Sequence, residues 1–415
     1  MRPSGVVVTG ASVLNAVAED LDAFTDALFA VRGGIRVREG MAGGWLPEFS
    51  VAGWAERHLA GDPAAAERLH AATRRAALPA RTAACVGLAA VRHAGLTDTD
   101  ETALIVAGNN LALDYHAEAL RRFHERPGSM RPSHALNHLD TDAVGTVSET
   151  TGVAGEGWTT GAASASGTVA ALLGARLIAA GELDSCLVVA PVAELSAAEF
   201  RAFQTSGAMA RADGDAEPAE LCRPFDRARS GFVYGQGAAA VLLESAEAAR
   251  RRGAEALAEV AGWGQRLDAR RGTAPNAAGQ VRALRSALAS AGVEPAEVDY
   301  VNAHGTGSVA GDPVEAEALA EVFGRTGRTG RTLVNSTKPL TGHCLSAAGL
   351  HELIATVLQL RGGFVHGNPC LHDPIDPGLG LLGTSTEKAD LRIAVSNSVA
   401  FSGINAALVL RSVKP

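Results

Sequence analysis

The sequence of 415 residues has little of what marks several large functional classes. Its five cysteines show no CxxC spacing, which argues against structural zinc and a disulfide framework and fits a reducing cytoplasm. A net charge of −8 argues against a nucleic-acid binder that acts through a general basic surface. No run approaches the roughly 18 to 20 apolar residues that a bilayer crossing needs. The start, MRPSGVVVTGAS, has one Arg before a strand-like run, so we expect no signal peptide.

What the sequence does have is apolar content in short, alternating segments. Hydrophobic residues make up 47% of the chain, enough for a large core. Short Val-, Ile- and Leu-rich runs between turn residues predict buried strands at 5–10, 103–108, 185–192, 238–245, 298–303, 332–337, 391–398 and 406–412. Longer Ala-rich amphipathic stretches predict helices at 19–30, 165–181, 316–323 and 345–363. This alternation indicates a layered α/β protein.

The pattern also repeats, which predicts two similar halves, residues 1–250 and 251–415. Each half has strands, a helix after a Gly/Ser/Thr-rich turn, and a terminal strand pair. We expect the charged stretch 245–259 to connect them. Residues 108–140 are rich in polar, aromatic and His residues, so we expect an excursion from the core that could line a site or make a dimer contact.

A first candidate for chemistry is VNAHGTGS, residues 301–308. A strand-like run leads His304 into a Gly-Thr-Gly turn, and an imidazole at a strand end beside an open turn is well placed for catalysis. Asp312 and Pro313, just beyond it, suit the start of a helix. On this motif alone, a His that caps a turn is the better interpretation.

The stretch NSTKPLTGHC, residues 335–344, is a stronger candidate. Lys338 precedes a Pro, so we expect it in an extended or turn conformation. His343 follows Thr-Gly and is expected to open a long helix. The partial positive charge of a helix N-terminus would favour a neutral imidazole that donates a hydrogen bond to a carbonyl.

Together with GAASASGT, residues 161–168, these stretches resemble the β-ketoacyl synthase family of the thiolase superfamily. In that family, motifs of the form AHGTGT…GD and K…GH…AAG carry two histidines and a lysine. Further matches lie at 223–245 and 397–410, so the resemblance covers essentially the whole chain. It implies an α/β thiolase fold, layered α-β-α-β-α from two pseudo-repeated halves, and usually a homodimer.

The resemblance also assigns site residues by position. It implies that His304 and His343 are the paired active-site histidines and that Lys338 and Glu315 are a supporting charged pair. Phe401 is implied as the gate residue, whose backbone N–H contributes to an oxyanion hole. Thr306 and Gln236 complete the supporting set, and Gln236 stands where condensing members usually have Glu. No cofactor or metal is implied, because the substrate is carried on the phosphopantetheine arm of an acyl carrier protein.

The nucleophile is where the sequence departs from the family. The family's Cys begins a helix and is followed three residues later by Gly in many members; aligning on Gly167 places Ser164 there, with Ser166 as the other candidate. A helix end or a nearby His can lower a thiol pKa from about 8.5 into the working range, but a serine hydroxyl needs a dedicated base. Ser164 should therefore block condensation. Decarboxylation of a malonyl thioester would survive, because it needs only a stabilised enolate.

One subgroup of the family fits this departure. Residues 131–170 and 231–236 look like the freestanding malonyl-carrier-protein decarboxylases of polyketide β-branching cassettes, which carry Ser at the Cys position. The implied reaction converts malonyl-S-ACP to acetyl-S-ACP for a hydroxymethylglutaryl-type synthase. Two alternatives stay open: a serine-based acyltransferase or thioesterase that uses Ser164, and a non-catalytic partner that resembles chain-length factors.

The expected partners follow from the substrate. Carrier proteins are acidic, so we expect a basic rim at the entrance, with candidates at 121–131, at Arg227 and Arg229, and at 269–271. A homodimer and the enzymes of a β-branching cassette are also implied, whereas nucleic-acid and membrane partners are not.

Overall fold

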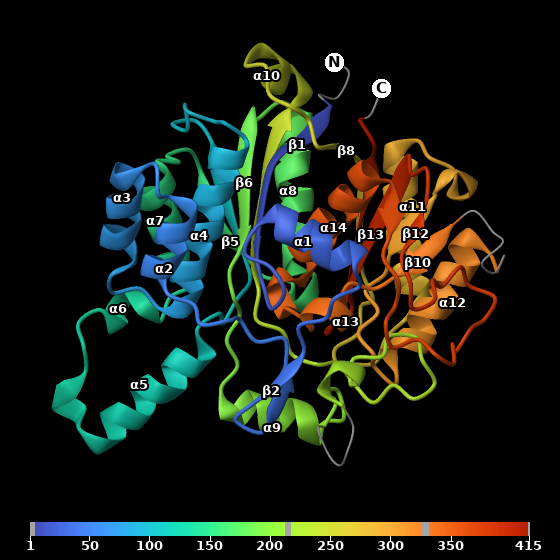
Figure 1. Ribbon diagram of the computed structural model, residues 1–415, viewed down its shortest axis with the longest axis horizontal. Helices are drawn as coiled ribbons and strands as arrows, with labels where there is room; N and C mark the ends of the chain where they lie inside the picture. The colour runs from blue at the N-terminus through green and yellow to red at the C-terminus, as the bar shows by residue number, and fades with distance from the viewer. Residues whose placement is uncertain (1–4, 212–216, 326–331, 414–415) are drawn as a thin grey trace.

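Two five-stranded arrays with the same strand order meet in one continuous sheet in the computed structural model, which describes residues 5–211, 217–325 and 332–413 (Figure 1). The first array runs β5–β4–β6–β7–β1, with β1 Val6–Leu14, β4 Ala103–Ala107, β5 Gly157–Thr160, β6 Ser185–Ala190 and β7 Ala238–Ser245. The second runs β10–β9–β13–β14–β8, with β8 Ala258–Leu267, β9 Tyr300–Asn302, β10 Leu333–Asn335, β13 Ile393–Ala400 and β14 Ile404–Arg411. Parallel and antiparallel pairings match between the arrays, and β1 pairs with β8 where they join.

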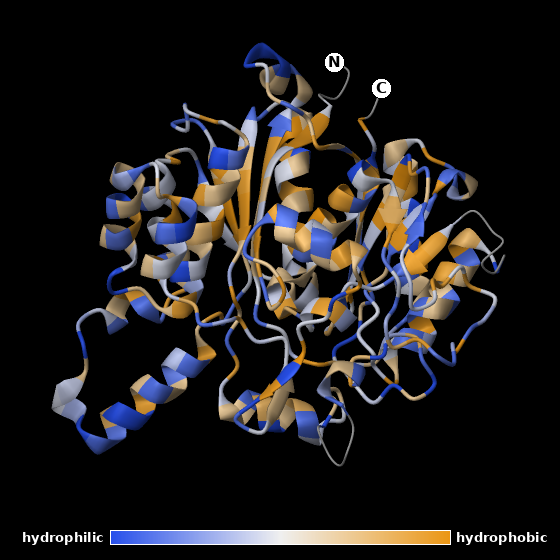
Figure 2. Cartoon of the chain, in the orientation of Figure 1, coloured by the Kyte–Doolittle hydropathy of each residue, from blue (hydrophilic) through white to orange (hydrophobic). Residues whose placement is uncertain are grey.

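Helices fill the spaces between and outside the two arrays (Figure 1). The central layer is α8 Ser166–Ala180 and α14 Ala348–Gly362. One outer layer holds α4 Leu78–His93 and α7 Thr141–Thr151, and the other holds α11 Ala277–Ala291 and α12 Gly311–Phe323. Hydrophobic residues concentrate on the strands and the central helices (Figure 2). The expected layered fold from two pseudo-repeated halves is therefore confirmed, whereas the boundary at 250/251 stays a prediction.

The two central helices cross at glycines. A Cβ on Gly167 would lie 2.7 Å from the backbone nitrogen of Leu350, and one on Gly349 would lie 2.6 Å from that of Thr168. Both distances are too short for any side chain, so the helix starts touch through their backbones. The window Ala163–Ala180 is long and apolar enough to span a membrane, contrary to expectation, but 61% of it is buried inside the protein. Its hydrophobicity is that of a core helix.

The predicted strands and helices all form, with shifted ends. Two strands of the ten-stranded sheet were missed, β5 and β8. β5 is four residues long and exposed on the sheet edge, so it lacks an apolar run; in β8, glycines interrupt the pattern. The stretch 245–259 is not a plain connection, because it contains α10 Ala246–Arg251 and the first residues of β8. The remaining elements are α1 Leu21–Phe29, β2 Arg36–Arg38, β3 Met41–Gly43, α2 Val51–His58, α3 Pro63–Thr73, α9 Ala197–Thr205, α13 Lys338–Thr341, β11 Phe364–Val365 and β12 Glu387–Lys388.

An arm leaves the core where the excursion was predicted. It carries α5 Leu113–Glu125, the 3₁₀ turn η1 Pro127–Ser129 and α6 His134–Asn137, and α5 extends away from the body (Figure 1). Its base lies near the site described below. Farther out, its exposed apolar side chains are Leu120, Phe123, Met130, Leu136 and Leu139.

Candidate active site

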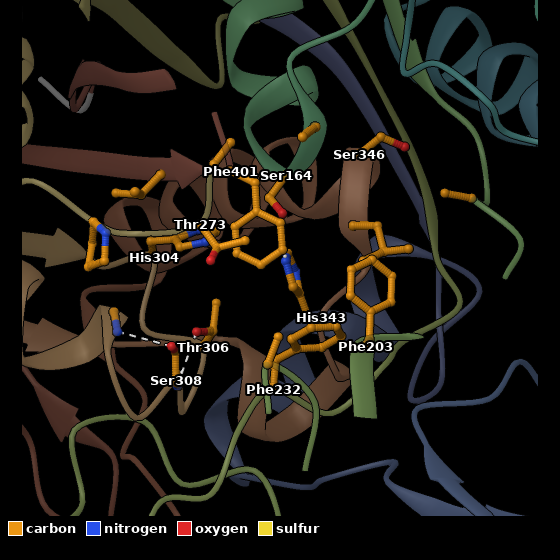
Figure 3. A pocket seen from close by; sticks show the side chains of 18 of the residues that line it. Ser164, Phe203, Phe232, Thr273, His304, Thr306, Ser308, His343, Ser346 and Phe401 are labelled. Atoms are coloured by element: carbon orange, nitrogen blue, oxygen red, sulfur yellow. Dashed lines mark hydrogen bonds between the residues drawn. The ribbon is translucent and has the colours of Figure 1, made fainter. Parts of the chain in front are cut away.

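A cavity of about 270 Å³ opens between the two halves and collects most of the predicted residues (Figure 3). Ser164, His304, His343, Thr306 and Phe401 all line it. Its walls are mainly apolar, with contributions from Leu113, Leu195, Phe203, Phe232, Leu345 and Val399. Three predicted site residues do not line the cavity: Lys338, Glu315 and Gln236. The position of each is described below.

Ser164 lies in the turn that starts the first central helix. The turn is the 3₁₀ segment η2, Ala163–Ala165, which Ala163 enters at φ 45°. Ser164 Oγ lies 2.9 Å from His343 Nε2. Ser166 is different: its hydroxyl donates to the Ala163 carbonyl at 2.7 Å and accepts from the Ala162 N–H at 2.8 Å. Of the two candidates, only Ser164 faces the cavity, and Ser166 caps the turn.

His304 follows β9 into the turn as predicted, and Glu315 holds that turn. The Glu315 carboxylate accepts from the backbone N–H groups of His304 and Gly305, both at 2.7 Å, and from Asn397 Nδ2 at 2.7 Å. These three donors satisfy the hydrogen-bonding capacity of the buried Glu315 carboxylate, so it needs no cation as a partner. The expected ion pair between Lys338 and Glu315 is therefore wrong, and Glu315 fixes the backbone that presents His304.

The true partner of Lys338 is Glu352, one turn into α14. The Lys338 ammonium forms an ion pair with the Glu352 carboxylate, and both side chains are 2% exposed. Lys338 Nζ also donates to the His304 carbonyl and lies 3.4 Å from His304 Nδ1. Lys338 begins the short helix α13, so the expectation of an extended or turn conformation is wrong. A lone Glu in the apolar stretch HELIATVLQL was the available signal for Glu352, because buried carboxylates are paired.

Both active-site imidazoles are held neutral. Burial, and then the charge of Lys338, place the pKa of His343 well below its usual value. The same causes, with His343 in addition, lower the pKa of His304 in the same way. His343 does not open a helix, since α14 begins at Ala348, so burial and not the helix end is the main cause. The two rings lie 5.5 Å apart, edge to face.

The partners of the ring nitrogens fix the tautomers. Lys338 can only donate, so His304 Nδ1 accepts and the proton is on Nε2. His343 Nδ1 is buried and has no hydrogen-bond partner within the described parts of the chain. Leaving an acceptor unpaired there costs less than leaving an N–H unpaired, so the proton of His343 is also on Nε2. The cavity therefore holds two neutral imidazoles, each with an N–H to donate.

The Gly-Thr-Gly turn is held from below by Asp312. Its carboxylate accepts from the N–H groups of Thr306, Gly307 and Ser308 at 3.1–3.2 Å. Burial raises the pKa of Asp312 to about 6. Thr306 lines the cavity, and its hydroxyl accepts from the Ser308 N–H, so it stabilises the turn that forms this part of the wall.

Phe401 lines the cavity next to the C-terminal strand pair and is 40% exposed. Its segment is tied to the loop after β8. Ser402 N–H donates to the Gly272 carbonyl at 2.8 Å, and Asp268 accepts from Asn405 Nδ2 at 2.9 Å. Residues of both segments line the cavity. The oxyanion role of the Phe401 N–H stays a prediction.

Gln236 lies outside the site. Its Oε1 accepts from the Leu46 N–H at 3.2 Å, and it lines a different cleft with Trp45 and Tyr234. Placing Gln236 with the supporting residues was wrong, because both its side chain and its backbone N–H bind the 44–46 segment and it does not line the cavity. Its role in the structure is to anchor that segment.

Comparison with known proteins identifies the family of the chain. Models of the β-ketoacyl synthase family match residues 4–249 with the N-terminal domain and residues 257–372 with the C-terminal domain. The polyketide biosynthesis malonyl-ACP decarboxylase PksF of Bacillus subtilis (strain 168) is 34% identical over 343 residues, which are 82% of this chain and 81% of PksF. The 3-oxoacyl-(acyl-carrier-protein) synthase 2 of Staphylococcus aureus (strain COL) is 36% identical over 65% of this chain and 64% of its own length.

Solved structures match almost the full length. The ishigamide ketosynthase/chain length factor is 29% identical with a TM-score of 0.87, covering 99% of this chain and 100% of its own. A β-ketoacyl synthase from Burkholderia phymatum STM815 is 28% identical with a TM-score of 0.86 over the same shares.

Proposed function

The chain belongs to the β-ketoacyl synthase family, and from that premise we propose that it converts malonyl-S-ACP to acetyl-S-ACP for polyketide β-branching. The observation that carries the proposal is the combination of two neutral, N–H-donating imidazoles with a serine that no base activates. PksF, which its name describes as a malonyl-ACP decarboxylase, supports the proposal by its similarity.

The reaction uses the two histidines as donors. The thioester carbonyl oxygen binds between His304 Nε2–H and His343 Nε2–H. The bond to the carboxylate then breaks, CO₂ leaves, and the electron pair becomes the enolate of the acetyl thioester. The two N–H groups stabilise the negative oxygen, and the α-carbon takes a proton from water. Fixed donors of this kind are typically worth about 3 to 4 kcal/mol each.

The same geometry disfavours condensation. A condensing enzyme must first hold an acyl chain covalently, and Ser164 would have to attack as an alkoxide. His343 donates to Ser164 Oγ in the favoured tautomer, so it does not accept the hydroxyl proton. We therefore expect no acyl-enzyme on Ser164.

A serine acyltransferase or thioesterase is the second candidate, favoured by the 2.9 Å contact between Ser164 and His343. A Ser-His-Asp site needs a carboxylate on His343 Nδ1 to hold the tautomer that accepts the serine proton. The buried Nδ1 has no such partner among the residues of the described ranges. The third candidate, a non-catalytic partner, ranks below because His304, Lys338 and His343 are all retained and assembled.

The deciding experiment is intact-protein mass spectrometry of malonyl-carrier protein incubated with the enzyme. We expect a loss of CO₂ from the carrier and no mass added to the enzyme, with the reaction abolished in His304→Ala. An acyl group on Ser164 would favour the acyltransferase. An unchanged malonyl carrier would favour the accessory partner.

The carrier would dock beside the cavity entrance, at the 269–271 segment. Arg121 and Arg122 are paired with Glu118, and Arg227 with Asp373. By contrast, Arg270 and Arg271 have no partner among the described side chains. They are exposed and lie between Asp268 and Thr273, which line the cavity. Free positive charge at the entrance suits an acidic carrier.

The remaining partner proposals concern assembly. We propose a homodimer through the β5 edge, whose exposed strand carries Trp158, together with the apolar side chains of the arm. Sedimentation of the wild-type protein checks it. A hydroxymethylglutaryl-type synthase as consumer of the product, and a reducing compartment such as the cytoplasm, remain part of this proposal.

A further inference from the structure

Ser346 stands out among the cavity residues because nothing in the mechanism above uses it. Its side chain is 5% exposed, and its hydroxyl has no hydrogen-bond partner within residues 5–211, 217–325 and 332–413. A buried hydroxyl without a partner is unfavourable unless something else binds it. Ser346 also lines the cavity; its hydroxyl points away from Ser164 in Figure 3, so a turn of the side chain about its Cα–Cβ bond would let a ligand in the cavity supply the missing partner.

Its position is the counterpart of Ser164 in the second half. The turn Leu345–Ala347 precedes α14 as Ala163–Ala165 precedes α8, and both turns begin with a positive φ, 49° at Leu345 and 45° at Ala163. Ser164 and Ser346 are the middle residues of these turns. The two turns pack against each other, so both serines border one cavity.

The cavity has two sides, and each would face a different end of a small substrate. Figure 3 shows His304, Thr273 and Thr306 on one side, Ser164 and His343 in the middle, and Ser346 with Phe203 on the other. A thioester carbonyl held by the histidines leaves the rest of the acyl group to point past Ser164. The side of Ser346 is therefore where a malonyl group would place its carboxylate.

The charged residues around the cavity are compatible with a carboxylate that leaves as CO₂ during the reaction. Among the described residues, no Lys or Arg lines the cavity. A cation would hold the carboxylate in the ground state, whereas a neutral donor orients it with little cost to the departure of CO₂. Two acidic residues line the cavity. Asp268 is engaged by Asn405, and burial raises the pKa of Glu194 to about 7, which weakens its repulsion of an anion at neutral pH.

We propose that the Ser346 hydroxyl donates a hydrogen bond to the free carboxylate of the malonyl thioester and positions it for decarboxylation. This inference rests on the proposed function and adds the residue that distinguishes a malonyl from an acetyl group. This hydrogen bond forms to the carboxylate of the bound substrate and is lost when that carboxylate leaves as CO₂.

The test is the kinetics of Ser346→Ala on malonyl-carrier protein, with acetyl-carrier protein as competitive inhibitor. A lost hydrogen bond to a charged group predicts a KM about tenfold higher or more, with a smaller change in kcat. The inhibition constant of the acetyl carrier should not change. Ser346→Thr, which keeps the hydroxyl, should restore most of the KM. An unchanged KM, or equal changes for malonyl and acetyl carriers, would overturn the proposal.

Ser396→Ala is the matched control. Ser396 is fully buried and its hydroxyl also lacks a hydrogen-bond partner among the residues that the structure describes, but it does not line the cavity. It should leave both constants unchanged. A second measurement separates this inference from the proposed function: the affinity of His304→Ala for malonyl and acetyl carriers, with and without Ser346→Ala. If the wild type does not decarboxylate but a Ser346-dependent preference for malonyl persists, only the proposed function fails. If no preference exists, Ser346 is not the carboxylate group.

Discussion

The two halves of the chain build the same frame and put it to different uses. In the first half, two residues, 161–162, join the edge strand β5 to the serine turn. In the second half, nine residues, 336–344, join β10 to the equivalent turn. That longer connection carries Lys338 and His343. The two halves thus share the strands and helices that position the site. The longer connection of the second half, residues 336–344, carries two of its main chemical groups.

The largest difference between the two halves should be lost when His343, in the 336–344 connection, is replaced. His343→Ala should lower the decarboxylation rate about 10²- to 10³-fold, because it deletes one donor to the enolate oxygen. Carrier-linked mass spectrometry under single-turnover conditions measures the rate. The melting temperature should stay close to wild type. A variant that retains more than a tenth of the activity would remove His343 from the mechanism.

The shared frame itself is tested by the glycines at the helix crossing. Gly167→Ala and Gly349→Ala should each destabilise the protein by about 1 to 3 kcal/mol, because a Cβ at either position meets the backbone of the other helix. Urea unfolding measures the loss. Gly145→Ala in α7, where a Cβ has open space, is the control and should be neutral or stabilising. Strongly unequal losses at Gly167 and Gly349 would show that the halves are not energetically equivalent.

The histidines of the second half also predict a pH dependence. Both have a folded-state pKa well below 6.5, so they stay neutral and active as the pH falls to 6.5 and somewhat below. In the unfolded chain they take up protons below about pH 6.5. Stability is therefore unaffected above that pH and falls below it, by up to about 1.4 kcal/mol per pH unit for each histidine.

Urea unfolding of wild type and His343→Ala at pH 7.5, 6 and 5 isolates the contribution of one histidine. The variant should lose less stability on acidification. Equal slopes would mean that folding does not lower the pKa of His343, and the assignment of a neutral imidazole held by burial would fail.

The smallest expected effect lies at the docking segment. Arg270→Glu should raise the KM for the carrier-bound substrate by up to about fivefold at low salt and less at high salt, since exposed charge pairs contribute under about 1 kcal/mol. A small malonyl thioester should react unchanged. Arg121→Glu, on the arm, is the comparison variant. A larger effect there than at Arg270 would move the docking surface to the arm.

Much of this site could be predicted from the sequence because its main groups lie in short contiguous motifs. His304, Lys338 and His343 were assigned because their motifs together resemble the family, although the motif around His304 alone favoured a turn cap. Glu352, Asp312 and Ser346 could not be assigned their roles in this way. Their roles depend on which segments meet in space, as when Glu352 of α14 reaches Lys338 of α13. Gln236 shows the reverse error. It differs from the Glu usual in the family within a matching motif, and it was therefore expected in the site, but it does not line the cavity.

The glycine crossing has a consequence for how this enzyme can vary. Where two helices touch backbone to backbone, the separation of their first turns is set by backbone atoms, and only substitution of the crossing glycines, Gly167 and Gly349, changes it. Ser164 stands on one of these turns, and His343 is two residues before the other. The crossing therefore serves as a fixed reference point for the site. Outer helices and surface loops can change in sequence over time while the distance between Ser164 and His343 is preserved.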